Sequence, residues 1–232
     1  MVLALGVSAV LLKSLRRPAK LLGLVDTPGG RKAHDRPTPT IGGVAILIAF
    51  SFALVALLPK AASTLHPAFW TGLSLLAVAG MVDDARGLKS WPKLAIQVLA
   101  AGLAVFWGGV QLQDLGSWPS GASIALGAIA LPLTWLAIVG FVNAANMLDG
   151  VDGLAGGVLV VMLLWLAYAG SLAGAVLATQ VALVLAAALV GFLIHNMRSP
   201  FRRRASVFLG DAGSLSLGFA VAWLVIVISQ AP

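Results

Sequence analysis

Seven long apolar stretches follow one another along this chain, separated by short polar connections, and a shorter eighth stretch opens it. A helix needs roughly 20 apolar residues to cross the ~30 Å hydrocarbon core of a bilayer, and most of these stretches reach that length once their flanks are included. We therefore predict an all-α, polytopic membrane bundle with about eight transmembrane helices. The stretches are residues 2–12, 41–58, 68–82, 94–112, 122–142, 154–170, 174–194 and 212–228.

The charge content is that of a membrane protein, and the eight stretches leave no room for a separate soluble domain. Only 10% of the residues are charged and 60% are hydrophobic, whereas soluble domains usually carry about 25% charged residues. We therefore predict a single transmembrane domain over residues 1–232. The sequence has no cysteine, which excludes disulfides and thiolate metal sites.

The positive charges lie almost entirely on one side of the predicted bundle. If the stretches cross alternately, all of the 15 lysines and arginines except Lys60 fall in the odd-numbered connections. The positive-inside rule makes that side cytoplasmic, which places both termini outside. A net charge of +7 can indicate a nucleic-acid partner, but this one-sided distribution indicates membrane lipids instead and no nucleic acid.

All eight acidic residues are aspartates, and only Asp114 lies on the side opposite the lysines and arginines. Charges collect in loops for solubility, which explains Asp26 and Asp35 well. It explains five others less well, because these abut apolar stretches, and a carboxylate inside a bilayer is costly. The five are Asp83, Asp84, Asp149, Asp152 and Asp211. We place these groups at the membrane–water boundary, where converging carboxylates favour a hard cation, Mg²⁺ or Mn²⁺.

The segment "NAANMLDGVDGLAGG" (143–157) spaces four polar side chains three residues apart. On an α-helix each such step drifts by about 60°, so neighbours are adjacent but all four cannot share one face. Gly150 and Gly153 permit an irregular turn that could bring the oxygens together. Helix packing by small residues explains the glycines but not the acids. The four side chains are those of Asn143, Asn146, Asp149 and Asp152.

Two further acidic sites stand at the ends of apolar stretches. Asp83 and Asp84 point about 100° apart on a helix, so one could bind a cation while the other acts as a base; the alternative is a solvated helix end with self-paired charges. Asp211 opens the last stretch, where a helix N-terminus attracts phosphate; its alternative is a plain N-cap. Gln97 and Gln180, inside apolar stretches, are interpreted as interhelical hydrogen-bonding residues.

Four segments, in this order, resemble those of one enzyme family: "RKAHDRPTPTIGG" (31–43), "DD" (83–84), the segment 143–157 and "FLGDAGS" (208–214). With their surroundings, from about residue 24 to residue 230, they resemble the polyprenyl-phosphate N-acetylhexosamine-1-phosphate transferases. The first segment is more similar to the GlcNAc-1-phosphate branch than to the muramoyl-pentapeptide branch. The resemblance implies Mg²⁺-dependent transfer of a hexosamine-1-phosphate from a UDP-sugar to undecaprenyl phosphate, with release of UMP, in cell-wall or lipopolysaccharide biosynthesis.

The resemblance also implies roles for single residues. The implied metal ligands are Asn146 and Asp211. The implied catalytic residues are Asp83 and Asp84 at the lipid phosphate, and Asp149 and Asp152 at the nucleotide–metal site. The implied substrate-binding residues are Lys93 at a phosphate, Phe208 against uracil, and Asn143 and Gly150. The site would face the cytoplasm from the bacterial plasma membrane, and the chain could form a homodimer.

The family continues with about two more helices and a cytoplasmic loop that carries a histidine motif. This sequence stops at Pro232, and His34, His66 and His195 do not replace that loop. We therefore expect a fragment or a shortened homologue with impaired activity. Two other functions stay open: an inactive homologue that binds lipid or partner helices, and a transporter, because intramembrane carboxylates mark transporters too. Attack could be direct, which we favour, or pass through an aspartyl-phosphate.

Overall fold

The computed structural model describes residues 1–27, 36–117, 123–198 and 204–231. Within these residues the regular structure is helical apart from two small antiparallel sheets. β1 (Val25–Asp26) pairs with β2 (Thr38–Pro39), and β3 (Asp114–Ser117) pairs with β4 (Ser123–Ala125). The predictions made for His34 and Asp35 fall outside the described residues.

Each of the eight predicted stretches contains most of one helix. A π-helical segment, Leu103–Trp107, extends the fourth, and a 3₁₀ turn, Gly127–Ile129, precedes the fifth. Two short helices, α2 (Arg16–Leu21) and α4 (Pro59–Thr64), lie in the connections. The eight are α1 (Val2–Ser14), α3 (Gly42–Leu57), α5 (Pro67–Arg86), α6 (Ser90–Gly102), α7 (Ala130–Leu148), α8 (Leu154–Leu172), α9 (Val176–Asn196) and α10 (Gly210–Ser229).

Among the described residues, five helical segments are long and apolar enough to cross a membrane: 90–107, 127–148, 154–172, 176–196 and 210–229. α1 and α3 are apolar but shorter, with 13 and 16 residues. α5 has 20 residues but ends in two aspartates and an arginine. The prediction of an all-α, multi-pass membrane protein is confirmed at this level, whereas the count of eight crossings and the outside position of the termini stay predictions.

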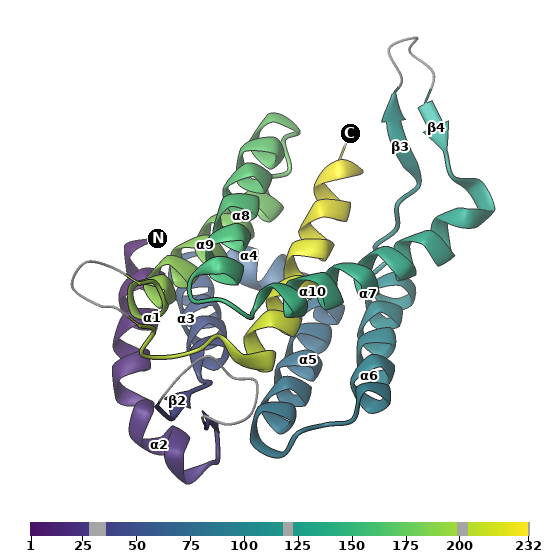
Figure 1. Ribbon diagram of the computed structural model, residues 1–232. Helices are drawn as coiled ribbons and strands as arrows, with labels where there is room; N and C mark the ends of the chain where they lie inside the picture. Colours follow the sequence, from purple (N-terminus) through teal and green to yellow (C-terminus); the bar gives the residue numbers. More distant parts are fainter. Residues whose placement is uncertain (28–35, 118–122, 199–203, 232) are drawn as a thin grey trace.

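The connection before α7 differs from the prediction of a helix over 122–142. Residues 123–125 pair with β3 in a hairpin that projects from the bundle (Figure 1). The Gln230 side chain at the end of α10 accepts hydrogen bonds from the backbone N–H of Gln113 and of Asp114, at 2.8 and 3.3 Å. Ile124, which falls within the predicted stretch 122–142, is an exposed residue of this hairpin.

α10 is the central helix of the bundle. Most of its residues are buried, and it packs chiefly against α5, α7 and α3 (Figure 1). A Cβ atom at Gly43 of α3 would lie 2.1 Å from the backbone nitrogen of Gly213, and one at Gly80 of α5 would lie 2.2 Å from that of Ala212. Glycine at these positions lets the helices touch backbone to backbone. This close packing brings the end of α5 to the beginning of α10, where the predicted site residues lie.

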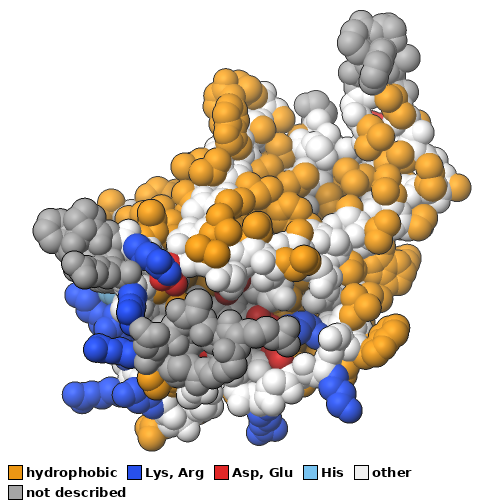
Figure 2. Space-filling view, in the orientation of Figure 1, with side chains coloured by type: hydrophobic (Ala, Val, Ile, Leu, Met, Phe, Trp, Pro, Cys, Tyr) orange, Lys and Arg blue, Asp and Glu red, His pale blue; other side chains and the backbone are white. Residues whose placement is uncertain are grey.

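The surface separates into a basic end and an apolar body. Figure 2 shows lysine and arginine side chains gathered at the end of the molecule where α2 and β2 lie in Figure 1, and many hydrophobic side chains over the opposite end. Large apolar side chains such as Leu136 on α7 and Trp165 on α8 are exposed. Exposed apolar side chains on helices of this length are expected where a protein meets lipid.

Candidate active site

Four carboxylates, one amine and one amide come together where helices begin or end. The six residues, which we call the carboxylate cluster, come from segments far apart in the sequence, so the cluster exists only in the folded chain. Asp83 and Asp84 lie in the last turn of α5, Lys93 in the first turn of α6, Asn146 and Asp149 at the end of α7, and Asp211 in the first turn of α10.

Lys93 joins two of these carboxylates. Its Nζ forms ion pairs with Oδ2 of Asp83 and with Oδ2 of Asp211. Oδ1 of Asp83 also accepts a hydrogen bond from the backbone N–H of Leu88 at 2.5 Å, which fixes this carboxylate beside the start of α6. The Lys93 and Asp83 side chains are only 21% and 11% exposed, so water screens the pair less than it would on an open surface. Asp83 of the two adjacent aspartates therefore pairs with the ammonium group of Lys93.

Asn146 holds Asp211 from the other side. Its Nδ2 donates to Oδ1 of Asp211 at 2.9 Å and to Oγ of Ser214 at 2.8 Å. The two residues predicted as metal ligands thus contact each other directly. Ser214 is fully buried and was not singled out from the sequence. Its position three residues after Asp211 on α10 puts both side chains on one helix face, and that spacing is the signal that could have revealed it.

Asp84 caps α10 from a different helix. Its Oδ1 accepts the backbone N–H of Asp211 at 3.0 Å, and its Oδ2 accepts that of Ala212 at 3.3 Å. The first N–H groups of a helix have no partner within the helix and attract negative charge. Asp211 lies in the first turn of this helix, where its own carboxylate pairs with Lys93 and accepts the hydrogen bond from Asn146. Gly210, with φ 74°, permits the approach, because a Cβ there would lie 2.6 Å from Oδ2 of Asp84.

Asp149 completes the cluster from the loop that follows α7. Burial, with the charges of Asp211 and Asp84, raises the pKa of Asp149 to about 8, although a backbone hydrogen bond from Gly210 acts in the opposite direction. The carboxyl group is therefore mostly protonated at neutral pH. A protonated carboxyl can donate a hydrogen bond as well as accept one.

Asn143 and Asp152, the first and last of the four polar side chains in the segment 143–157, do not lie in the cluster. Nδ2 of Asn143 donates to Oε1 of Gln97 at 2.5 Å, deeper in the helical part of the bundle. Oδ2 of Asp152 accepts from Nε of Arg198 at 2.8 Å and from the backbone N–H of Ala205 at 3.2 Å. The expected convergence of all four oxygens does not occur, and Asn146 and Asp149 alone of the four reach the cluster.

Helix geometry explains this separation. α7 stays helical through Asn143 and Asn146, so its side chains turn away by about 60° at each step of three. The chain then reverses at Gly153, whose φ of 81° begins α8. Gly150 is exposed, has no positive φ and has open space around its Cβ position. Its role in substrate binding stays a prediction.

Phe208 lies two residues before α10, in the segment that leads to Asp211. Its side chain is half-buried, its backbone N–H donates to the carbonyl of Pro39 at 2.8 Å, and its own carbonyl accepts from Gly42 at 2.9 Å. The segments that precede α3 and α10 are therefore joined by their backbones. The contact of Phe208 with uracil stays a prediction.

Comparison with known proteins identifies the family. The sequence pattern of glycosyl transferase family 4 matches residues 66–229, a range that contains the whole carboxylate cluster. The chain belongs to glycosyl transferase family 4. The family resemblance drawn from the four segments is thereby confirmed.

Several relatives of this chain are named as sugar-phosphate transferases. The chain is 36% identical over 211 residues to a probable undecaprenyl-phosphate N-acetylglucosaminyl 1-phosphate transferase of Bacillus subtilis, covering 90% of this chain and 57% of that protein. It is 33% identical over 224 residues to the undecaprenyl-phosphate alpha-N-acetylglucosaminyl 1-phosphate transferase of Escherichia coli K12, covering 93% and 58%. It is 34% identical over 225 residues to a phospho-N-acetylmuramoyl-pentapeptide-transferase of Synechococcus, covering 90% and 62%. The chain thus spans little more than half the length of these relatives.

The side-chain oxygens of the carboxylate cluster suit a hard divalent cation. Carboxylate and amide oxygens are the ligands that Mg²⁺ accepts, and it commonly takes one or two protein carboxylates and completes its shell with substrate phosphates. With Asp149 protonated, three carboxyl groups, those of Asp83, Asp84 and Asp211, face one ammonium group, which leaves excess negative charge. Across the described ranges, however, no three His, Cys, Asp or Glu side chains form a ready set of ligands, and Lys93 lies between Asp83 and Asp211. The residues fit a cation that shares its ligands with a substrate.

Asn196, at the end of α9, is a second residue that sequence reasoning missed. It is buried; its Oδ1 accepts the backbone N–H of Gly153 at 2.7 Å, and its Nδ2 donates to the carbonyl of Val207 at 2.9 Å. The side chain ties the loop before α8 to the segment before α10. It follows His195 in an otherwise apolar helix, and a buried amide at a helix end was the available signal.

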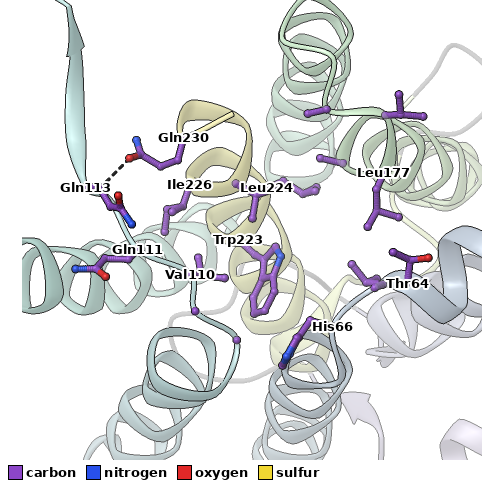
Figure 3. Close-up of a pocket in the computed structure, with 17 residues that line it drawn as sticks. Thr64, His66, Val110, Gln111, Gln113, Leu177, Trp223, Leu224, Ile226 and Gln230 are labelled. Carbon is purple, nitrogen blue, oxygen red and sulfur yellow. Dashed lines mark hydrogen bonds between the residues drawn. The ribbon is translucent and has the colours of Figure 1, made fainter. Parts of the chain in front are cut away.

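A separate cavity of about 470 Å³ lies beside the last turns of α10, far along this helix from Asp211. Trp223 and Ile226 line it from α10, with His66 from the start of α5 and Leu177 from α9 around them (Figure 3). The residues that line it include none of the predicted site residues. The candidate active site is therefore the carboxylate cluster at the other end of the helix.

Proposed function

We propose that this chain transfers a hexosamine-1-phosphate, most simply GlcNAc-1-phosphate, from a UDP-sugar to undecaprenyl phosphate and releases UMP. The observation that carries the proposal is the meeting of Lys93, Asn146 and Asp211, from three different helices, in one cluster. The names of the relatives supply the class of reaction. A polar cluster at the end of an apolar bundle suits a reaction between a water-soluble donor and a membrane-bound acceptor.

In the proposed reaction an oxygen of the lipid phosphate attacks the β-phosphorus of the UDP-sugar. The bond between this phosphorus and the bridging oxygen breaks, the electron pair leaves with UMP, and the sugar phosphate stays on the lipid. Positioning and positive groups near the phosphoryl oxygens lower the barrier of such transfers. Lys93 supplies an ammonium group for a phosphate, and Asp83 and Asp84 orient the lipid phosphate for direct attack.

Mg²⁺ is the proposed cofactor, with Mn²⁺ as a substitute. Asn146 and Asp211 would hold it, and when bound it would polarise the diphosphate and neutralise charge on the leaving UMP. Asp149 donates its backbone N–H to the carbonyl of Asn146 at 3.2 Å and would help to organise the nucleotide–metal site. Asp152 would contribute through Arg198, whose guanidinium it holds.

The cytoplasmic face is the proposed location of the site. UDP-sugars are cytosolic, and the lysines and arginines of the sequence fall in the same connections as the cluster. The cluster residues also lie in the first or last turns of their helices or just beyond them. Transporters bind their substrates near the bilayer midplane, so this position favours a transferase over a transporter.

A UMP-release assay with a matched pair of aspartate variants tests the proposal. Membranes that contain the chain, supplied with UDP-GlcNAc, undecaprenyl phosphate and Mg²⁺, should release UMP. Asp211→Asn keeps the shape but removes the charge that pairs with Lys93, and should lower the rate by about 10²-fold or more. Asp114→Asn is the control, because that side chain accepts the N–H of Gly116 at 2.8 Å in the distant hairpin, and its rate should match the parent.

Two results would contradict the proposal. One is equal UMP release by Asp211→Asn and the parent chain. The other is no release from folded parent chain with any UDP-N-acetylhexosamine; binding of the UDP-sugar without release would then support the inactive homologue. Comparison of UDP-GlcNAc with UDP-GalNAc and with UDP-MurNAc-pentapeptide identifies the donor.

A further inference from the structure

A pair of amide side chains, of which Gln97 is buried and Asn143 half-buried, links α6 to α7 beneath the carboxylate cluster. Gln97 of α6 is only 2% exposed, and its Oε1 accepts the hydrogen bond from Nδ2 of Asn143 at 2.5 Å. The same Nδ2 donates to the carbonyl of Val139 in its own helix at 2.9 Å. Both helices are among the segments apolar enough to cross a membrane, so little water is available to replace these contacts.

The pair stands one helical turn from two residues of the cluster. Gln97 follows Lys93 by four residues on α6, and Asn143 precedes Asn146 by three on α7. Residues three or four apart lie on the same face of a helix, one above the other. The faces that carry Gln97 and Asn143 therefore also carry Lys93 and Asn146, and the latter two both contact the Asp211 side chain.

We propose that Gln97 is a positioning residue. Acting through Asn143, it sets the axial register of α6 against α7 so that Lys93 and Asn146 reach Asp211 at the same time. A slide of one residue moves a helix by about 1.5 Å, and this is enough to break the hydrogen bond between Asn146 and Asp211. The inference rests on the proposed function for its kinetic consequence, but its geometric consequence can be measured without turnover.

A second contact between the same helices does not fix the register in the same way. Trp135 Nε1 of α7 donates to the backbone carbonyl of Val98 on α6 at 2.9 Å. Its acceptor is a backbone carbonyl, which every residue of a helix offers, so a neighbouring carbonyl could take its place after a slide. Gln97 offers a side-chain acceptor found at one position only, and for this reason we assign the register to the Gln97–Asn143 pair.

The test compares a broken pair with an exchanged pair. Gln97→Met removes the acceptor but keeps a long, unbranched side chain in the core. The double variant Gln97→Asn with Asn143→Gln exchanges the two side chains and keeps both partners. Gln180→Leu, in the distant α9, is the matched control for loss of an amide inside an apolar helix. Asn143→Ala breaks the pair from the other side if Gln97→Met gives no folded protein.

Cross-linking measures the register directly, because the sequence contains no cysteine. Lys93→Cys and Asn146→Cys are introduced together and joined by a short bismaleimide in folded protein. The proposal predicts efficient cross-linking in the parent and in the Gln180→Leu background, loss by several-fold with Gln97→Met, and recovery in the exchanged pair. Cross-linking that Gln97→Met leaves unchanged overturns the proposal.

Kinetics supply the second readout. UMP release by Gln97→Met should show a kcat lower by about 10²-fold, as for a misplacement of about 1 Å, with nearly unchanged KM for the UDP-sugar, and the exchanged pair should recover most of it. A merely stabilising role predicts instead an unchanged kcat per folded molecule, which overturns the proposal, as does an exchanged pair that folds but restores neither readout. If the parent releases no UMP, the proposed function fails and the cross-linking result alone decides this inference.

Discussion

Two adjacent aspartates, Asp83 and Asp84, show how single residues divide the chemistry of this site. Asp83 pairs with the ammonium group of Lys93, and Asp84 accepts two backbone N–H groups of α10. Their separation follows from the angle between neighbouring residues on a helix and was predictable from the sequence. The identity of the partners was not, because Lys93 and the first turn of α10 reach them only through tertiary packing.

In the segment 143–157, too, the sequence predicted that polar side chains form a site but not which partners they contact. Its position beside an apolar stretch predicted a polar site, and Asn146 and Asp149 do lie in the cluster. The outer two residues find partners elsewhere, Asn143 with Gln97 and Asp152 with Arg198. Sequence spacing gives the direction of each side chain on its helix but not which neighbouring helix faces it, so these partners could not be predicted.

The raised pKa of Asp149 predicts that the stability of the folded chain depends on pH. Its pKa is raised from 3.8 to about 8 in the folded chain. Between these values the unfolded chain has lost a proton that the folded chain keeps, so the free energy of unfolding should fall as pH rises through this window and level off above it. In Asp149→Asn this contribution is absent. Melting temperatures in detergent from about pH 5 to about pH 8, without divalent cations, should therefore fall less steeply for the variant than for the parent; parallel curves would refute this role of Asp149.

Glycine residues determine how closely the helices of the bundle pack against one another. The eight helical stretches were predictable from hydropathy because each is a continuous apolar run, and α3 begins within one residue of the expected position. The hairpin at β3 and β4 was not predicted, because residues 123–125 lead directly into the apolar residues of α7 and were assigned to the same stretch, 122–142. The central position of α10 was not predictable either, because it depends on backbone contacts at Gly43 and Gly80 that hydropathy does not register.

Gly43 and Gly157 provide a matched test of this packing. Both are helical, and alanine favours a helix over glycine by up to about 1 kcal/mol. Gly157→Ala has no atom within 4 Å of its new Cβ, so it should be neutral or stabilising. Gly43→Ala would place its Cβ 2.1 Å from the Gly213 nitrogen and should lower the free energy of unfolding by about 1–3 kcal/mol. Chemical denaturation in detergent measures both, and equal stability of the two variants would show that α3 and α10 do not touch as described.

At the scale of the whole molecule, an apolar bundle carries its basic residues and its carboxylate cluster at one end. Composition and the placement of lysine and arginine predicted this polarity, because charged groups avoid the bilayer interior. The carboxylate cluster lies within the 66–229 range shared with glycosyl transferase family 4. The orientation of the bundle in the membrane and the number of crossings stay predictions, since both depend on the bilayer.

The central claim is that groups from distant segments meet to pass a sugar phosphate from a nucleotide to a lipid. The measurement that tests it most directly uses UDP-GlcNAc labelled with ³²P at the β-phosphate, membranes containing the chain, undecaprenyl phosphate and Mg²⁺, followed by extraction of lipids. The account predicts that the label moves into the lipid fraction with the parent chain and with Asp114→Asn, and stays in the aqueous fraction with Asp211→Asn. Label that stays water-soluble with the parent chain, or that reaches the lipid equally well with Asp211→Asn, would contradict the account.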